Sequence, residues 1–188
     1  MRILIILLGL IILPAHGGGL NKEGCHNNRK TGDYHCHRGA KVPSRFQGPS
    51  PLPVFSGKPK VTDGDTIRIG NIRIRLHGID APEAEQTCTA GGREWRCGHE
   101  ATNALTEIIA DRSVSCNRRD KDRYGRIVAV CRAGSIDLNA WMVEEGWAVA
   151  YRRYSMDYVQ DEGEARGRKA GLWRGEFAMP WDWRRRKR

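Results

Sequence analysis

The chain has 188 residues, of which 29% are charged and 39% are hydrophobic. This composition is that of a folded globular protein and excludes a disordered or fibrous chain. The formal net charge of +10 favours a polyanionic partner such as nucleic acid, a phosphorylated polymer or an anionic surface. A merely soluble basic protein is the alternative that charge alone leaves open.

The first residues have the pattern of a secretory signal peptide. Arg2 supplies a positive start, residues 3–13 are apolar, and Ala15 and Gly17 are small residues at the spacing of a cleavage site. The apolar run is shorter than the roughly 20 residues that span a bilayer. The sequence therefore predicts a cleaved signal peptide over residues 1–17 and a secreted or periplasmic protein without a stable membrane span. We expect the mature protein to be a monomer.

A Cys/His-rich module over residues 18–40 comes next, followed by a linker over residues 41–59 that contains five prolines. The mature chain has six cysteines, and an exported protein meets an oxidising compartment, so disulfides are expected. Locality suggests the pairs Cys25–Cys36, Cys88–Cys97 and Cys116–Cys131. A zinc site in the module is the alternative, although the spacing is not that of a standard zinc finger; its ligands would be Cys25, His26, Cys36 and His37.

The main domain is expected over residues 60–175, and its pattern is that of an α+β fold. Strand periodicity and a two-residue turn predict a hairpin over residues 66–76, and a stripe of apolar residues predicts a helix over 99–112. Further strands and helices are expected, in chain order, at residues 113–116, 126–131, 138–145, 147–151 and 157–169. This order fits a small closed antiparallel barrel with helices packed around it. Residues 176–188 form a basic tail that contains two tryptophans.

The chemistry of the chain is concentrated at the ends of the predicted hairpin. Asp65, Asp80 and Glu83 are hard oxygen donors, which favour Ca²⁺ or Mg²⁺ over Zn²⁺ if they converge. Arg75 and Arg126 could hold a phosphodiester and neutralise the charge that grows on it during attack. Glu83 could hold or deprotonate a water molecule. The alternative for each residue singly is a solvated surface ion pair.

Strand parity raises a difficulty in this hairpin. A strict two-residue turn at Gly70-Asn71 places Asp65 opposite Leu76, whereas Arg75 lies on the other face, opposite Thr66. We therefore expect a bulge, a twist or a strand end near residue 65 or 75 that brings the two side chains together.

The motifs VTDGDTIRI, RIRLHGIDAPE, DRYGR and LNAWMVEEGWAVAY, in this order, resemble the thermonuclease family, the staphylococcal nuclease homologues. The resemblance covers roughly Lys60 to Trp173. It implies a five-stranded OB-fold barrel with about three packed helices. It also implies a Ca²⁺-dependent nuclease that hydrolyses phosphodiester bonds of DNA and RNA with low sequence specificity.

The resemblance also implies roles for individual residues. Asp65, Asp80 and the backbone carbonyl of Ala81 correspond to the calcium ligands, and Glu83 corresponds to the residue that handles the attacking water. Asp63 corresponds to a secondary acidic neighbour. Arg75 and Arg126 correspond to the two catalytic arginines that bind phosphate, and the substrate-binding positions are Arg123, Tyr124 and Tyr151.

Three features depart from the family pattern: the cysteines, the basic tail and the Cys/His module, which resembles the YHYH-type domain found beside exported nucleases. The tail is expected to attract phosphate, and its tryptophans either dock it on the barrel or stack on bases. Two other functions stay open. One is a catalytically silent OB-fold nucleic-acid binder, and the other is a cell-envelope protein that binds through the module.

Overall fold

The computed structural model describes residues 25–27, 34–36 and 54–187 of the chain. The chain divides into two compact units, residues 1–48 and 49–188. In the first unit, β1 (Cys25–Asn27) pairs with β2 (Tyr34–Cys36) in an antiparallel ladder that places Cys25 opposite Cys36. The predicted signal peptide and linker start, and the side chains of the disulfide and zinc alternatives, lie outside the described residues.

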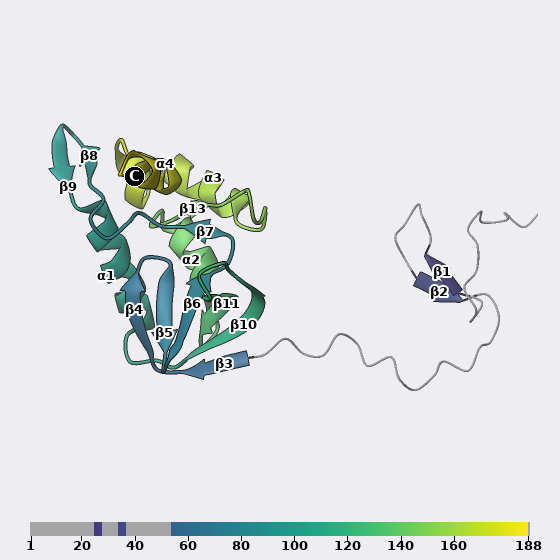
Figure 1. Ribbon diagram of the computed structural model, residues 1–188. Coiled ribbons are helices and arrows are strands. Elements are labelled where there is room, and N and C mark those ends of the chain that lie inside the picture. Colours follow the sequence, from purple (N-terminus) through teal and green to yellow (C-terminus); the bar gives the residue numbers. More distant parts are fainter. Residues whose placement is uncertain (1–24, 28–33, 37–53, 188) are drawn as a thin grey trace, which may run out of the picture. The chain divides into compact units, whose positions relative to one another are not determined.

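The second unit is built on a curled sheet in the order β3-β10-β11-β6-β5-β4, with the two-residue strand β12 (Ile136–Asp137) beside β11 (Figure 1). Its strands are β3 (Val54–Gly57), β4 (Pro59–Asp63), β5 (Thr66–Ile69), β6 (Ile72–Leu76), β10 (Val114–Lys121) and β11 (Ile127–Ala133). All neighbours are antiparallel except β6 and β11, which run parallel. This order, from β10 to β4, is that of a five-stranded OB-fold, which confirms the predicted fold class.

The hairpin of β5 and β6 has the predicted register. Ile69 pairs with Ile72 around the Gly70-Asn71 turn, and Thr66 pairs with Arg75. β5 begins at Thr66, and Asp65 lies in the turn before it, where its carbonyl accepts a hydrogen bond from the Leu76 backbone N–H (2.8 Å). Because Asp65 lies beyond the end of the regular strand, its side chain need not point to the face that strand alternation would assign to it. The ladder between β4 and β5 also shifts register between Val61 and Asp63.

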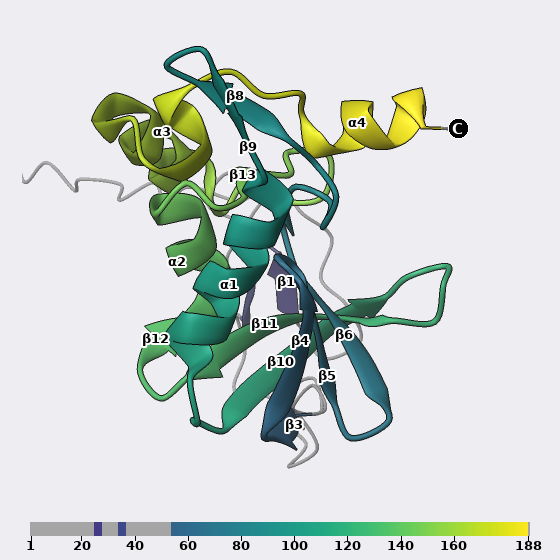
Figure 2. The same ribbon diagram turned by 90° about the vertical axis from the view of Figure 1, so that its left-hand side faces the viewer.

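Helices cover one side of the sheet and its upper end (Figure 2). Four α-helices and one 3₁₀-helix are present in the described residues: α1 (Cys97–Ile109), α2 (Leu138–Glu144), α3 (Val159–Arg168), η1 (Gly171–Arg174) and α4 (Pro180–Arg186). Asp137 caps the start of α2, because its carboxylate accepts from the backbone N–H groups of Asn139 and Ala140 (both 3.1 Å). Short ladders join β7 (Ile79–Asp80) to β13 (Val149–Ala150), and β8 (Cys88–Ala90) to β9 (Arg93–Trp95).

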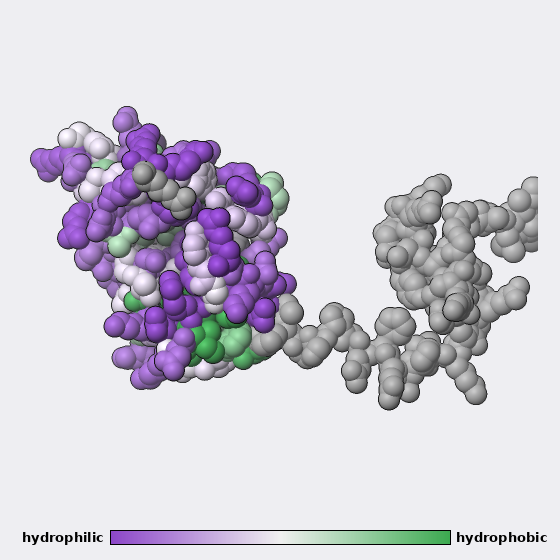
Figure 3. Space-filling model, viewed as in Figure 1, coloured by the Kyte–Doolittle hydropathy of each residue, from purple (hydrophilic) through white to green (hydrophobic). Residues whose placement is uncertain are grey.

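Apolar side chains gather in two clusters. The main core lies between the sheet and helices α1 and α2 and includes Ile67, Ile74, Leu105 and Met142, all fully buried. The second cluster contains Cys88, Cys97, Val149 and Leu172, and the C-terminal aromatic side chains pack on it. Hydrophilic residues cover most of the face shown in Figure 3, with an apolar patch at its lower edge, near β3.

Two predicted disulfides are confirmed, Cys88–Cys97 and Cys116–Cys131. Two boundaries differ from the prediction. β3 lies inside the segment predicted as linker, because it pairs with β10 and so belongs to the sheet. The predicted tail contains α4, because Met179 and Trp181 pack on the second apolar cluster. In the part of the chain that the structure describes, no helix is long and apolar enough to cross a membrane.

Candidate active site

Asp65 is fixed by the turn between β4 and β5. Its backbone N–H donates to Asp63 Oδ1 (3.1 Å), and its own buried carboxylate accepts from Thr66 Oγ1 (2.9 Å) and from the Ala81 N–H (3.2 Å). Gly64 permits this turn to pack tightly, since a Cβ atom there would lie 2.7 Å from the Ala81 Cβ. The DGD sequence therefore places one carboxylate against the segment that carries Asp80.

Arg75 joins the two buried aspartates. Its Nη2 atom lies 2.9 Å from Asp65 Oδ2 and 2.6 Å from Asp80 Oδ1, and its Nη1 atom donates to Asp65 Oδ1 (3.0 Å). The Asp80 side chain is 0% exposed. The structure thus brings together three predicted site residues that lie on the turn before β5, on β6 and on β7.

The carboxylates of this cluster are short of positive charge. Burial raises the pKa of Asp80, and Asp65 adds to this rise, although the hydrogen bond from Arg184 opposes it. Burial and, after it, the charge of Asp65 raise the pKa of Asp63 to about 7. Burial is the larger cause of both shifts, and a further cation beside these carboxylates would stabilise their negative forms.

Glu83 lies just beyond β7 and, unlike the aspartates, reaches solvent, with 43% of its side chain exposed. Its turn is closed by a hydrogen bond from the Gln86 N–H to the Glu83 carbonyl (2.7 Å). The buried Gln86 also accepts from the Gly98 N–H at its carbonyl (3.1 Å) and donates through Nε2 to the Ala178 carbonyl (2.6 Å). The turn is therefore held between α1 and the C-terminal segment, and Glu83 is accessible to water.

An unpredicted arginine completes this cluster. Arg184, on α4, donates through Nη2 to Asp80 Oδ2 (2.7 Å) and through Nη1 to Asp80 Oδ1 (3.1 Å) and Glu83 Oε1 (2.7 Å). Hydrogen bonds and charge from both carboxylates raise the pKa of Arg184, against the opposing effect of burial. A shallow pocket of about 360 Å³ lies beside it, lined by Glu83, Ala84, Glu85, Trp183, Arg184 and Lys187.

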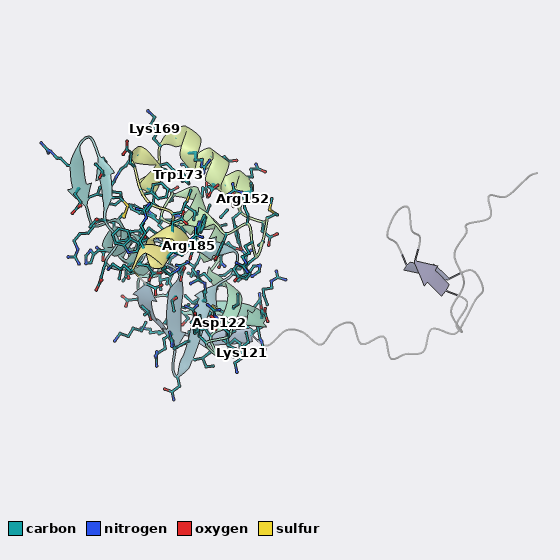
Figure 4. The ribbon with its side chains drawn as sticks, turned by 45° about the horizontal axis from the view of Figure 1, so that its top comes forward. Lys121, Asp122, Arg152, Lys169, Trp173 and Arg185 are labelled. Atoms are coloured by element: carbon teal, nitrogen blue, oxygen red, sulfur yellow. A yellow bond between two sulfur atoms is a disulfide. The ribbon has the colours of Figure 1, made fainter. Side chains whose placement is uncertain are left out.

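Arg126, Arg123 and Tyr124 form a separate group in the loop between β10 and β11. Arg126 pairs with Asp122 (Nε to Oδ2, 2.7 Å), and both guanidiniums lie over the Tyr124 ring, Arg123 at 4.9 Å and Arg126 at 5.7 Å from its centroid. Burial alone would raise the pKa of Asp122, but the hydrogen bonds from Arg126 lower it. In Figure 4, Asp122 lies well apart from Arg185 on α4. Within the described residues, Arg126 makes no ion pair with Asp65, Asp80 or Glu83.

Tyr151, the remaining predicted substrate-binding residue, is positioned by a hydrogen bond from its N–H to the Gly78 carbonyl (2.8 Å). Its ring stacks on Trp181 of α4, with centroids 5.3 Å apart and planes inclined by 12°. Tyr154 meets the same ring edge-on at 4.8 Å. One face of the Tyr151 ring is thus covered by the chain's own tryptophan.

A row of cations crosses the sheet below this cluster. Lys60 of β4 pairs with Arg68 of β5, which pairs in turn with Arg73 of β6, and all three side chains are exposed. Like charges directly opposite one another destabilise a sheet. None of the three forms an ion pair with a carboxylate in the region that the structure describes. Arg73 and Arg75 share a face of β6, so this basic row leads away from the site.

Comparison with known proteins places this geometry in a family. Residues 73–175 match the family model described as staphylococcal nuclease homologue. The chain belongs to the staphylococcal nuclease homologues. It is 39% identical over 124 residues to the succinoglycan biosynthesis protein ExoI of Rhizobium meliloti (strain 1021), a match that covers 64% of this chain and 65% of that protein.

Two further relatives of this staphylococcal nuclease homologue carry nuclease names. An uncharacterized endonuclease of Escherichia coli is 36% identical over 136 residues, which cover 68% of this chain and 83% of the relative. A micrococcal nuclease of Shigella flexneri is 36% identical over 144 residues, which cover 67% and 78%. These relatives support a nuclease function. The chain spans somewhat less than two thirds of the length of the Rhizobium relative.

The donor set of this staphylococcal nuclease homologue fits a hard divalent cation. Asp65 and Asp80 are buried carboxylates, and oxygen-only ligation suits Ca²⁺ or Mg²⁺ rather than Zn²⁺. Among the described residues, no group of three or more His, Cys, Asp or Glu side chains is arranged to hold a metal ion. Both Asp80 oxygens and one Glu83 oxygen are instead bound by Arg184.

Sequence reasoning missed three residues that shape the site: Arg184, Gln86 and Gly98. Arg184 lies in a run of basic residues, in which nothing distinguishes one arginine from its neighbours. Gln86 and Gly98 act through backbone contacts that only the fold creates.

Proposed function

We propose that this protein is a cation-dependent nuclease that hydrolyses phosphodiester bonds of DNA or RNA with low sequence specificity, and that its cation is Ca²⁺. The observation that carries the proposal is the convergence of Asp65 and Asp80 on Arg75, with the exposed Glu83 beside them. Two buried carboxylates, a guanidinium and a water-accessible carboxylate are the groups that hydrolysis of a phosphodiester requires.

In the proposed reaction, Glu83 orients a water molecule and accepts its proton as the water oxygen attacks phosphorus. The bond from phosphorus to the 5′ oxygen breaks, the 5′ oxygen takes up a proton, and the products are a 3′-phosphate and a 5′-hydroxyl. Arg75 donates hydrogen bonds to the phosphoryl oxygens, whose negative charge grows during attack. Asp65, Asp80 and the Ala81 carbonyl would hold the cation, which supplies positive charge to the phosphate.

The loop between β10 and β11 and the basic row are proposed to bind the polymer. α4 and this loop lie on the same side of the domain, one above the other (Figure 2). Arg126, Arg123 and Tyr124 would approach the substrate from the loop, while Lys60, Arg68 and Arg73 would contact phosphates further along the chain. Phosphate contacts of this kind give affinity without base recognition, which agrees with low sequence specificity.

We also propose that the protein is exported, so that it acts outside the cytoplasm. The signal-peptide pattern and the two disulfides, Cys88–Cys97 and Cys116–Cys131, support this location. Expression of the full chain followed by cell fractionation tests it. Recovery of the full-length, uncleaved chain in the cytoplasm would argue against export.

The test of the nuclease proposal compares wild type with Glu83→Gln on plasmid DNA and on RNA, in Ca²⁺ and in chelator. We expect the substitution to lower the cleavage rate by about 10²–10⁴-fold, the range of general-base catalysis, with an unchanged melting temperature. Glu94→Gln, an exposed carboxylate on β9, is the matched control and should cleave like wild type. Cleavage by Glu83→Gln at the wild-type rate would remove Glu83 from the mechanism. Binding without cleavage by folded wild type would favour the silent nucleic-acid binder.

A further inference from the structure

The contact between α4 and the carboxylate cluster is more extensive than a surface ion pair. The Arg184 guanidinium takes both oxygens of Asp80 and one oxygen of Glu83, at 2.7–3.1 Å. Asp80 Oδ1 also accepts from Arg75 (2.6 Å). The Asp80 side chain is fully buried, and its two carboxylate oxygens are bound by Arg75 and Arg184. Arg184 therefore supplies the positive charge that the cluster otherwise lacks.

The rest of α4 reinforces this contact at both ends of the helix. Trp181 stacks on Tyr151, and Lys187 pairs with Glu85 (2.8 Å). Before the helix, the Ala178 carbonyl accepts a hydrogen bond from Gln86 (2.6 Å). One short helix thus contacts a proposed cation ligand, the proposed water-handling residue and the proposed base-stacking ring.

We propose that Arg184 determines the cation affinity of this site by competing with the divalent cation for Asp80 and Glu83, and that α4 leaves the site when cation and nucleic acid bind. This inference rests on the proposed nuclease function. A calcium ligand oxygen lies at 2.3–2.6 Å from the ion, so a cation bound by Asp80 and Glu83 would lie close to the Arg184 guanidinium, and the two positive charges repel each other. Trp181 would compete with a base for the ring face of Tyr151 that it covers.

The structure allows α4 to leave without unfolding the domain. The helix has seven residues, and only Pro180 among them is buried. Helices this short are not stable alone in water, so the docked contacts hold it in place. The preceding segment is anchored separately, because Glu176 and Thr89 exchange two backbone hydrogen bonds (2.9 and 2.7 Å). Movement can therefore begin after Glu176.

The substrate itself would favour release of α4. The end of the helix carries Arg184, Arg185, Arg186 and Lys187 in sequence. A polyanion offers these cations new partners at the moment when the divalent cation takes the carboxylates. The two ligands are therefore expected to promote each other's binding, since each removes part of what holds α4 on the site.

The experiment measures Ca²⁺ binding calorimetrically, without nucleic acid, in the full mature chain. If α4 covers the site about 90% of the time, removing it tightens the apparent affinity about tenfold. We therefore expect Arg184→Gln to bind Ca²⁺ about tenfold more tightly than wild type. Arg186→Gln makes the same charge change on an exposed position of the same helix, and it should bind Ca²⁺ like wild type. Trp181→Ala removes the stacking of α4 on Tyr151, so it should also tighten Ca²⁺ binding.

A second measurement follows the helix directly. Amide hydrogen exchange in residues 181–186 should become faster when Ca²⁺ is added to wild type, because release exposes these N–H groups. Equal Ca²⁺ affinity in wild type, Arg184→Gln and Trp181→Ala would overturn the inference while leaving the nuclease proposal intact. If no variant bound Ca²⁺ and folded wild type did not cleave DNA or RNA, both would fail together.

Discussion

The sharpest structural prediction concerns Gly98, in the first turn of α1. A Cβ atom built on Gly98 would lie 1.7 Å from the Glu83 carbonyl oxygen and 2.6 Å from the carbonyl carbon, whereas ordinary contacts begin near 3.4 Å. Both partners are backbone, and the Gly98 N–H is also bonded to the Gln86 carbonyl. In Gly98→Ala, the turn that carries Glu83 must therefore move away from α1.

The size of the effect follows from two opposed contributions. Alanine in place of glycine favours a helix by about 0.8–1.0 kcal/mol, whereas forcing atoms into a packed region costs about 1–3 kcal/mol, and sometimes more. Because the contact is with backbone, which cannot rotate out of the way, the cost lies at the upper end and the net loss should be about 2 kcal/mol. For a protein of this size the melting temperature should then fall by roughly 4–8 °C. If Glu83 is displaced by about 1 Å, cleavage should slow by about 10²-fold.

Gly163→Ala is the matched control, because Gly163 is also helical, in α3, and a Cβ there meets nothing within 4 Å. This variant should gain a few tenths to about 1 kcal/mol of stability and cleave like wild type. Thermal melting followed by circular dichroism and a plasmid cleavage assay would measure both variants. The reasoning is refuted if Gly98→Ala is as stable and as active as Gly163→Ala.

Two more predictions concern stability and substrate binding. Replacing Cys116 and Cys131 together by Ser opens a 15-residue loop, so the free energy of unfolding should fall by about 3 kcal/mol in a urea titration, with cleavage at 25 °C retained. A loss below about 1 kcal/mol would show that the unfolded chain gains little conformational entropy when this disulfide is removed. Replacing the basic row of Lys60, Arg68 and Arg73 by Gln should reduce the salt dependence of DNA binding by about 2–3 in log–log slope, and relief of repulsion should slightly raise the melting temperature. An unchanged slope would mean that the row does not contact phosphates.

The hairpin and its immediate chemistry were predictable because the information is local. Gly70-Asn71 sets the register of β5 and β6, so the pairing of Thr66 with Arg75 follows from counting residues. The same counting places Asp65 and Arg75 on opposite faces of a regular hairpin. A bulge, a twist or a strand end was expected to bring them together, and the structure has a strand end, at Thr66. The disulfides Cys88–Cys97 and Cys116–Cys131 followed from locality, and the latter pair lies directly opposite in the β10–β11 ladder.

The contribution of α4 was not predictable because it depends on contacts far apart in the sequence. Arg184 lies 104 residues from Asp80, and its neighbours in the basic run carry the same charge. A seven-residue helix has too little periodicity to be recognised, and it forms here because Trp181 and Met179 pack on the second apolar cluster. β3 was not predicted for the same reason, since only its pairing with β10 makes the end of a proline-rich segment a strand.

The clustering of carboxylates at one place in a strongly basic protein needs a physical explanation. Asp63, Asp65, Asp80 and Glu83 lie close together, and Arg75 supplies one positive charge among them, so the cluster is incomplete without another cation. Burial raises the pKa of Asp80 and Asp63, and the charge of Asp65 adds to this rise, so a nearby cation would stabilise their negative forms. Arg184 supplies one positive charge, and a divalent cation would supply two. Because both would bind the oxygens of Asp80, Arg184 and the divalent cation are alternative counter-ions for one site. Exchange between them would tie the proposed catalysis to the supply of cation and polyanion.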